Sequence, residues 1–301
     1  MNAESAQAES LRRAPPGFTD AQWEDFHEKG LVMIEGALSR EEIDYYLAAV
    51  DRVAAADPKW QPGQSLRCSN AVEHDPAVAE LIDHDRHIGF VYDIFGEMTR
   101  LLRSDLRIRD RGTDNNDWHP DTPRAVPYLV FSPELPIRMS VAYWLTDIPN
   151  PKMGNFVYLP GSHRMQYLDE YYTNDHAPGE EIVCVEAGTL TVYNGNLWHR
   201  VEPNETDVAR KNFFFSYCPS WVTAGDHYFS SPELLQSLNR EQHIIMRSYD
   251  DPHALENPDA SEFPLFLDRD TGSDSDAGAQ QHVPLRIRKR VTAAERRLSG
   301  Q

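Results

Sequence analysis

Hydrophobic residues near the start of the chain recur at the spacing of a short helix. Thr19 and Gln22 have the spacing of a capping box, in which each residue caps a backbone N–H of the other. Trp23 and Phe26 then supply an apolar face, and Gly30 is a stop signal. We therefore predict a helix between Thr19 and Gly30.

A strand and a longer helix are predicted next. Residues 31–38 form the apolar run LVMIEGAL, which is typical of a buried strand. Ser39 and Glu42 have the spacing of a second capping box. The apolar positions that follow have the periodicity of an amphipathic helix: Ile43, Tyr46, Leu47, Val50, Val53 and Ala54. A further helical region is predicted over residues 76–103.

From about Leu106 the pattern changes to short runs of β-branched and aromatic residues. Pro, Gly and Asn separate these runs, which are LRIRD, VPYLVF, IRMSVAYWLTD, NFVYLP, EEIVCV, GTLTVYNGNLWHRV and KNFFFSYCP. Many short strands at close intervals indicate a sandwich or barrel. We predict a mainly β fold with a helical N-terminal part, as one domain over residues 19–267 with its β core at about 106–221. A brief helix is predicted near residues 232–247.

The two ends of the chain differ from this middle part in composition. Residues 1–18 and 268–301 are poor in apolar residues, which predicts disorder. The end of the second segment is basic, and we interpret it as a solvated terminal segment rather than as an electrostatic docking peptide.

Composition and charge exclude several functional classes. The formal net charge of -19 repels nucleic-acid phosphates, so a nucleic-acid partner is not expected. No apolar run is long enough to span a bilayer, and the polar N-terminus lacks a secretory signal, so we expect a cytoplasmic protein. Cys68, Cys184 and Cys218 are widely spaced, which favours reduced thiols over a disulfide framework or a cysteine zinc site. The sequence leaves the oligomeric state open.

Three residues form a candidate metal site. His119 and Asp121, in DNNDWHPDTP, are two positions apart, and in extended chain such side chains share one face about 6.6 Å apart at Cα. The best third ligand is His199 in GNLWHRV. Two imidazoles and one carboxylate on one face of an octahedron are the arrangement that selects iron(II) in oxygenases. The three open positions can take a bidentate 2-oxo acid and dioxygen.

Arg210 adds a second element to this site, since His-x-Asp alone occurs by chance in many chains. It lies eleven residues beyond His199, across a turn-rich segment centred on Asn204 and Glu205. A hairpin about that centre would place Arg210 opposite His199. A guanidinium binds a carboxylate through two parallel hydrogen bonds, as the far carboxylate of 2-oxoglutarate requires. Pairing of Arg210 with an acid such as Asp207 is the alternative.

With these residues in view, the chain resembles the phytanoyl-CoA dioxygenase family over roughly residues 19–221. The resemblance rests on TDAQWEDFHEKGLVMIEGALSREE, the WHPD pair, a strand ending in LTD, GNFVYLPGSHR, and GTLTVYNGNLWHRVEPN followed by Arg210. It implies a double-stranded β-helix, or jelly-roll, core with His119, Asp121 and His199 as iron ligands. It also implies that Arg210 binds 2-oxoglutarate, which is converted to succinate as a C–H bond of the substrate is oxidised, usually by hydroxylation.

One position departs from the family pattern. Val201 stands two residues after His199, where the family often has a serine that helps to hold 2-oxoglutarate. Thr191 and Tyr193 lie at even spacing from His199 and are candidates to assist Arg210 instead. Halogenating relatives have Gly or Ala in place of the aspartate, so the carboxylate of Asp121 favours hydroxylation over halogenation.

The remaining polar and aromatic residues near the motifs have two interpretations each. We interpret GNFVYLPGSHR as a structural turn rather than as the source of a fourth ligand, His163. His84 and His87 are assigned to a solvated helix face rather than to zinc. For Trp118, Trp144 and Trp198 a place in the core is favoured over the substrate pocket, and Trp198 is the best pocket candidate among them. Candidates for substrate contact are Trp118, Trp198, Asn116 and Arg138.

The sequence therefore predicts an iron(II)- and 2-oxoglutarate-dependent oxygenase that uses O2 to hydroxylate a small specialised-metabolite or lipid-like substrate. The sequence leaves two alternatives open. One is a cupin-type metal enzyme that does not use 2-oxoglutarate, and the other is a non-catalytic jelly-roll binding module. Arg210 discriminates the oxygenase from the cupin-type enzyme, because only the oxygenase needs its guanidinium to bind 2-oxoglutarate, and stoichiometric iron binding discriminates both enzymes from the binding module.

Overall fold

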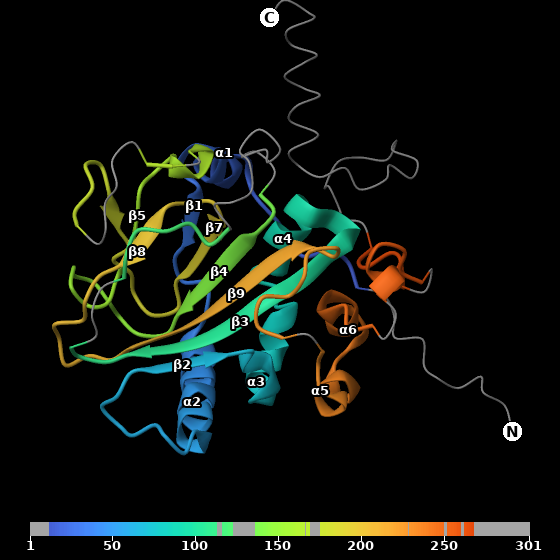
Figure 1. Cartoon of the computed structure of the whole chain (residues 1–301), viewed down its shortest axis with the longest axis horizontal. Coiled ribbons are helices and arrows are strands. Elements are labelled where there is room, and N and C mark those ends of the chain that lie inside the picture. Colours follow the sequence, from blue (N-terminus) through green and yellow to red (C-terminus); the bar gives the residue numbers. More distant parts are fainter. Residues whose placement is uncertain are drawn as a thin grey trace, which may run out of the picture.

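The structure is a computed structural model that describes residues 12–112, 116–122, 136–165, 167–168, 175–227, 229–249, 252–259 and 262–267. Its strands form two antiparallel sheets, and helices cover one of them (Figure 1). The helices are α1 (Asp20–Lys29), α2 (Arg40–Ala56), α3 (Pro76–Ala79), α4 (Ile88–Phe95), α5 (Pro232–Ser237) and α6 (Arg240–Met246).

The larger sheet has six strands in the order β1-β7-β4-β9-β3-β2. Their bounds are β1 (Leu31–Ile34), β2 (Leu66–Ser69), β3 (Thr99–Arg109), β4 (Met139–Trp144), β7 (Leu190–Asn194) and β9 (Arg210–Pro219). The smaller sheet has the order β6-β5-β8, with β5 (Phe156–Tyr158), β6 (Glu181–Ile182) and β8 (His199–Val201). The two sheets pack on each other through a shared apolar cluster that includes Trp144 from β4 and Phe156 from β5, an arrangement of the jelly-roll type.

Alternation along the strands of the larger sheet gives its two faces different roles. Leu106 on β3 and Phe213, Phe215 and Tyr217 on β9 are fully buried and belong to the cluster that also contains residues of α1, α2, α3, α4 and α6. On the same strands, the side chains at the alternate positions point the other way, towards the smaller sheet. The helices therefore seal one face, and the other face is left to line an internal space.

Several of the predicted elements are confirmed. Both capping boxes are present, at Thr19 with Gln22 and at Ser39 with Glu42, and Gly30 ends α1 in the left-handed conformation with φ 85°. The apolar run at 31–38 forms a strand over its first half only. The helix expected near 232–247 is two helices, α5 and α6.

The helical prediction for residues 76–103 is wrong at its end. Residues 99–103 belong to β3, because their backbone pairs with β9. A register shift between Leu101 and Arg103 accommodates their irregular alternation of side chains. The larger sheet also contains β1 and β2, so the β core starts before residue 106. The run VPYLVF and residues 268–301 lie outside the described residues.

The prediction of disorder over residues 1–18 is wrong for residues 12–18. Ala14 donates its backbone N–H to the carbonyl of Leu267 at 2.9 Å, and Phe18 is buried against Trp23, Phe26 and Phe90. Residues 1–11 lie outside the described residues. The contacts of Ala14 and Phe18 thus extend the folded unit towards the N-terminus.

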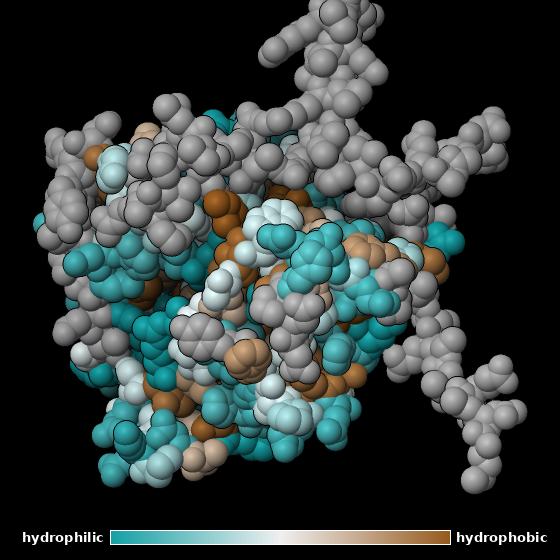
Figure 2. Space-filling model, turned by 45° about the vertical axis from the view of Figure 1, so that its right-hand side comes forward, coloured by the Kyte–Doolittle hydropathy of each residue, from teal (hydrophilic) through white to brown (hydrophobic). Residues whose placement is uncertain are grey.

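Hydrophilic residues dominate the described part of the surface that Figure 2 shows. Figure 2 shows hydrophilic residues over most of the described part of one face, with hydrophobic residues in small groups among them. Within the described residues, no helix is long and apolar enough to cross a bilayer.

Candidate metal and co-substrate site

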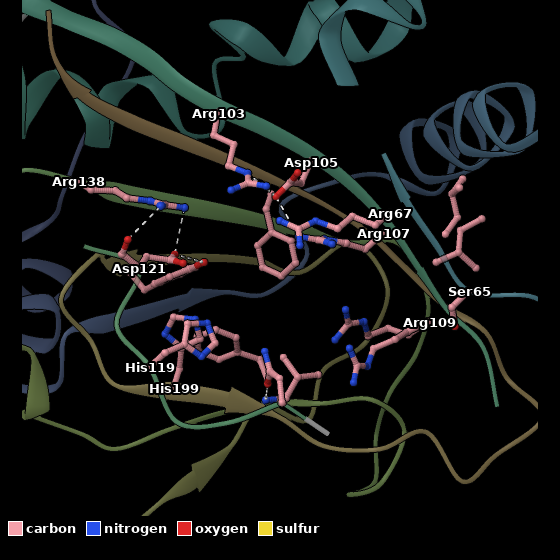
Figure 3. A pocket seen from close by; sticks show the side chains of 18 residues that line it. Ser65, Arg67, Arg103, Asp105, Arg107, Arg109, His119, Asp121, Arg138 and His199 are labelled. Atoms are coloured by element: carbon pink, nitrogen blue, oxygen red, sulfur yellow. Dashed lines mark hydrogen bonds and ion pairs between the residues drawn. The ribbon is translucent and has the colours of Figure 1, made fainter. Parts of the chain in front are cut away.

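A cavity of about 500 Å³ lies between the two sheets and contains the three predicted metal ligands (Figure 3). His119 and His199 form an isolated antiparallel bridge, with reciprocal backbone hydrogen bonds of 2.9 and 3.0 Å. Their rings lie 4.4 Å apart between centroids. The ligand atoms of His119, Asp121 and His199 all lie within 4.8 Å of one another, so they can share one metal ion.

Backbone carbonyls orient both imidazoles of this triad. Nδ1 of His119 lies 2.7 Å from the carbonyl oxygen of Asp117, and Nδ1 of His199 lies 2.8 Å from that of Leu197. A carbonyl only accepts, so Nδ1 must donate and Nε2 keeps its lone pair for a metal. Burial and the neighbouring His119 lower the pKa of His199 to about 4, which keeps its ring neutral at physiological pH.

Asp121 is held in its ionised form by the groups around it. Burial would raise its pKa, but the positive charge of Arg138, with the two histidines and the Tyr193 hydroxyl, lowers the pKa to about 2. Arg138 Nη2 lies 3.2 Å from Asp121 Oδ2, and the Ser140 hydroxyl lies 3.5 Å from the same oxygen. Two imidazoles and one carboxylate are thus the donor set that suits iron(II).

Arg210 reaches the same cavity from the start of β9. Its side chain is buried, Nη1 donates to the carbonyl of Gly154, and the guanidinium carbon lies 5.5 Å above the Trp144 ring. Nε is buried without a hydrogen-bond partner among the described residues. Burial and the nearby charges of Arg109 and Arg107 lower the pKa of Arg210. A buried guanidinium with an unused donor needs an anion beside it.

The route by which Arg210 arrives differs from the predicted hairpin. His199 lies on β8 of the smaller sheet, whereas Arg210 begins β9 of the larger sheet and pairs with Arg109 on β3. The segment between them crosses from one sheet to the other, and the Asn204 side chain braces it with bonds to the carbonyls of Arg109 and Val208 at 2.9 and 2.8 Å. The proximity predicted from sequence is correct, but the pairing that was to produce it is not.

Three residues that were predicted to contact the co-substrate or the substrate do not line the cavity. The Thr191 hydroxyl accepts from Trp144 Nε1 at 3.1 Å, and Thr191 does not line the cavity. Trp118 and Trp198 are buried in a separate cluster, and their ring N–H groups donate to the carbonyls of Asp175 and Met165. These two tryptophans are packing residues rather than cavity residues.

Other predicted residues do line the cavity. Asn116 accepts a hydrogen bond from the backbone N–H of Val201, and Tyr193 lies with its hydroxyl 3.4 Å from Asp121 Oδ2. Arg138 lines the cavity beside Asp121. Phe156, which the sequence did not single out, stacks on the His199 ring at 4.7 Å between centroids.

The sequence did not single out a row of charged residues on β2 and β3. Arg67, Arg103, Arg107, Arg109 and Asp105 line the cavity. They occupy alternate positions in the segments LRCS and RSDLRIR, so they share one face of the strands. That alternation of apolar and charged residues is the sequence signal that could have identified this row.

The predictions for the other histidines had different outcomes. His163 is confirmed as part of a turn, since Gly161 has φ 77° and His163 Nε2 bonds to the carbonyl of His27 at 3.1 Å. The assignment of His84 and His87 to a solvated helix face is wrong. His84 is half-buried, and His87 is fully buried between the hydroxyls of Tyr143 and Tyr217, before α4 begins.

Comparison with known proteins agrees with this geometry. The family model described as phytanoyl-CoA dioxygenase (PhyH) matches residues 26–212. Ectoine dioxygenase of Nocardia farcinica is 24% identical over 237 residues, which cover 65% of this chain and 76% of that protein.

Solved structures show the same fold. HygX from Streptomyces hygroscopicus, with nickel and 2-oxoglutarate bound, superimposes with a TM-score of 0.61 at 21% identity, covering 69% of this chain and 90% of HygX. SnoK, a carbocyclase from nogalamycin biosynthesis, has a TM-score of 0.53 at 20% identity, covering 68% of this chain and 87% of SnoK. The chain belongs to the phytanoyl-CoA dioxygenase family and is an iron(II)- and 2-oxoglutarate-dependent dioxygenase.

Proposed function

We propose that this enzyme hydroxylates a C–H bond of a small molecule and converts 2-oxoglutarate and O2 to succinate and CO2. One oxygen atom enters the product and the other enters succinate. The observation that carries the proposal is that the His119, Asp121 and His199 triad and the buried Arg210 line one cavity. The cavity volume of about 500 Å³ is within the range of small-molecule sites.

In this proposal each residue has a defined role within a single oxygenase domain over residues 19–267. His119, Asp121 and His199 hold iron(II), which supplies the oxidative chemistry when bound. Arg210 binds the far carboxylate of 2-oxoglutarate, and Arg109, directly opposite it in the β3–β9 register, assists in place of the missing serine. Tyr193 and Arg138 fix Asp121. Asn116 and Phe156 shape the substrate side of the cavity.

The relatives support a small-molecule substrate of the specialised-metabolite kind. HygX has been solved with hygromycin B bound, and SnoK acts in nogalamycin biosynthesis. The retained carboxylate at Asp121 supports hydroxylation rather than halogenation, because it occupies the position that a halide would need.

Arg210→Lys tests the proposal. Lysine keeps the charge but loses the planar pair of donors, so we expect 2-oxoglutarate affinity to fall by about tenfold or more while iron affinity stays unchanged. The measurements are iron content after anaerobic reconstitution, the visible band of the iron–2-oxoglutarate complex, and succinate formed with and without added substrate candidates.

The control is Arg40→Lys, which makes the same exchange at an exposed site on α2. If the metal-loaded Arg210→Lys variant binds 2-oxoglutarate as tightly as the wild type does, the proposed role of Arg210 is disproved. A protein that binds neither iron nor 2-oxoglutarate would disprove the proposed function itself.

A further inference from the structure

Arginines face each other directly at two places in the cavity wall. In the antiparallel register, Arg109 on β3 pairs with Arg210 on β9, and Arg107 on β3 pairs with Arg67 on β2. Side chains at such positions have Cβ atoms roughly 4.5–5.5 Å apart, and like charges there destabilise a sheet. Two such pairs, two residues apart along β3, mark a site built for anions rather than for stability.

The excess of positive charge among the described lining residues also favours an anion site. Among its described lining residues are two carboxylates, Asp105 and Asp121, and six arginines: Arg67, Arg103, Arg107, Arg109, Arg138 and Arg210. Iron(II) and the 2-oxoglutarate dianion would cancel each other, so the loaded cavity would keep its positive excess. This excess occurs in a chain of net charge -19, so it is a local feature and not a reflection of overall composition.

Arg107 is held in place by Asp105, and the pair that it forms with Arg67 is distinct from the pair that contains Arg210. Asp105 lies 3.1 Å from Arg107 Nη2 and accepts a hydrogen bond of 2.8 Å from the Ser69 hydroxyl. The same carboxylate lies 2.8 Å from Arg103 Nε, so one acid serves two arginines. Burial lowers the pKa of Arg107, and Asp105 only partly offsets this effect of burial.

Arg67 itself is exposed on β2, the edge strand, and makes no ion pair within the described residues. Figure 3 shows Arg67 and Arg107 together, on the opposite side of the cavity from His119 and His199. An anion entering past the sheet edge would therefore meet Arg67 and Arg107 before it reached the metal ligands.

We propose that the primary substrate is an anion, carrying a carboxylate or a phosphate group, and that Arg67 and Arg107 bind this group while the remainder of the substrate extends towards the metal. Asp105 is a positioning residue that orients Arg107. This inference rests on the proposed function, because it assigns the Arg109 and Arg210 pair to 2-oxoglutarate and leaves the second pair for the substrate.

The test is titration of full-length protein, loaded anaerobically with iron(II) and saturating 2-oxoglutarate, with inorganic phosphate and separately with benzoate. Benzyl alcohol serves as the uncharged counterpart of benzoate. We expect one of the two oxyanions to bind, which identifies the phosphate or the carboxylate source, and benzyl alcohol not to bind. Arg67→Gln loses a charge-assisted hydrogen bond, so its affinity for that oxyanion should fall by about tenfold or more.

Arg107→Gln should show the same loss, and Arg67→Gln is the primary variant because its exposed position leaves folding intact. Arg40→Gln removes one exposed positive charge on α2 and should bind the oxyanion like the wild type. The 2-oxoglutarate affinity should be unchanged in Arg67→Gln.

Three outcomes would overturn the inference. They are no oxyanion binding by the wild type, equal binding by Arg67→Gln and the wild type, or loss of 2-oxoglutarate binding in Arg67→Gln. Failure of the proposed function is recognised separately, as absence of iron or 2-oxoglutarate binding in the wild type. In that case the same titrations of the unloaded protein still decide whether Arg67 and Arg107 bind oxyanions.

Discussion

The residues around Asp121 form a compact hydrogen-bonded group at the junction of three strands. Arg138 Nη2 bonds to the Ser216 hydroxyl at 2.8 Å, and Ser216 lies 2.9 Å from the Ser140 hydroxyl. Ser140 and Tyr193 both reach Asp121 Oδ2. Such partners of a metal-binding carboxylate fix its orientation and tune its affinity for the metal.

Ser140→Ala is expected to weaken iron binding. The substitution removes one hydroxyl from the group that fixes Asp121 and leaves the three ligands in place, so iron affinity should fall by about 10-fold or more. Anaerobic iron titration measures this effect. Ser237→Ala, at a hydroxyl on α5 that only caps its own helix, is the matched control. Unchanged iron affinity in Ser140→Ala would show that Ser140 does not support the ligand.

At the level of elements, a buried hydrogen-bonded chain joins the segment before α4 to β4 and β9. The Tyr217 hydroxyl donates to the carbonyl of Ile82 at 2.8 Å, so it accepts from His87 Nε2 at 2.6 Å, and Nδ1 then accepts from Tyr143. Burial lowers the pKa of His87 well below its ordinary value, so the ring stays neutral in the folded protein.

This chain predicts a pH dependence of stability. Below a pH of about 6.5 the unfolded protein binds a proton at His87 that the folded protein does not. The free energy of unfolding should therefore decrease as the pH falls, with His87 contributing up to about 1.4 kcal/mol per pH unit. Denaturant unfolding of iron-free protein between pH 7 and pH 5 measures this slope.

His87→Gln should show a shallower slope than the wild type over the same range, besides a lower stability from the lost hydrogen bonds. His243→Gln, at an exposed position on α6, should keep the slope of the wild type. Equal slopes for the wild type and His87→Gln would contradict a neutral buried imidazole.

For the whole molecule, contacts between distant parts of the chain complete the fold. The segment at residues 12–14 pairs with Leu267 in a parallel bridge, and Phe18 packs on Phe90 at 4.8 Å between ring centroids. The backbone N–H of Phe18 also donates to Asp93 Oδ2 at 2.8 Å. The segment before α1 is therefore part of the core that supports the helices behind the larger sheet (Figure 1).

Phe18→Ala should destabilise the protein by about 3–5 kcal/mol, because it leaves a cavity among three aromatic rings. Phe229→Ala, at a side chain that is 72% exposed, should change the free energy of unfolding by less than about 0.5 kcal/mol. Chemical denaturation at constant pH gives both values. If the two variants are equally stable, Phe18 does not belong to the cooperative unit.

An element could be predicted from the sequence when the residues that specify it lie close together along the chain. Helix caps and alternation act over a few residues, so Thr19, Ser39 and most strands of the core were found. Residues 99–103 were placed in a helix because their pairing with β9 is remote in sequence. His87 was placed on the surface because its two tyrosine partners lie 56 and 130 residues away.

The same division applies to the site. The sequence by itself was enough to predict the family and to select His119, Asp121, His199 and Arg210, which the structure brings to one cavity, since the residue types and their motifs carry that chemistry. Only the tertiary structure decided that Thr191, Trp118 and Trp198 turn away from the cavity. It also decided that four arginines of β2 and β3 turn into it. The physical reason is that alternation divides a strand into two faces, but only the packing of the two sheets and the helices decides which face encloses the cavity.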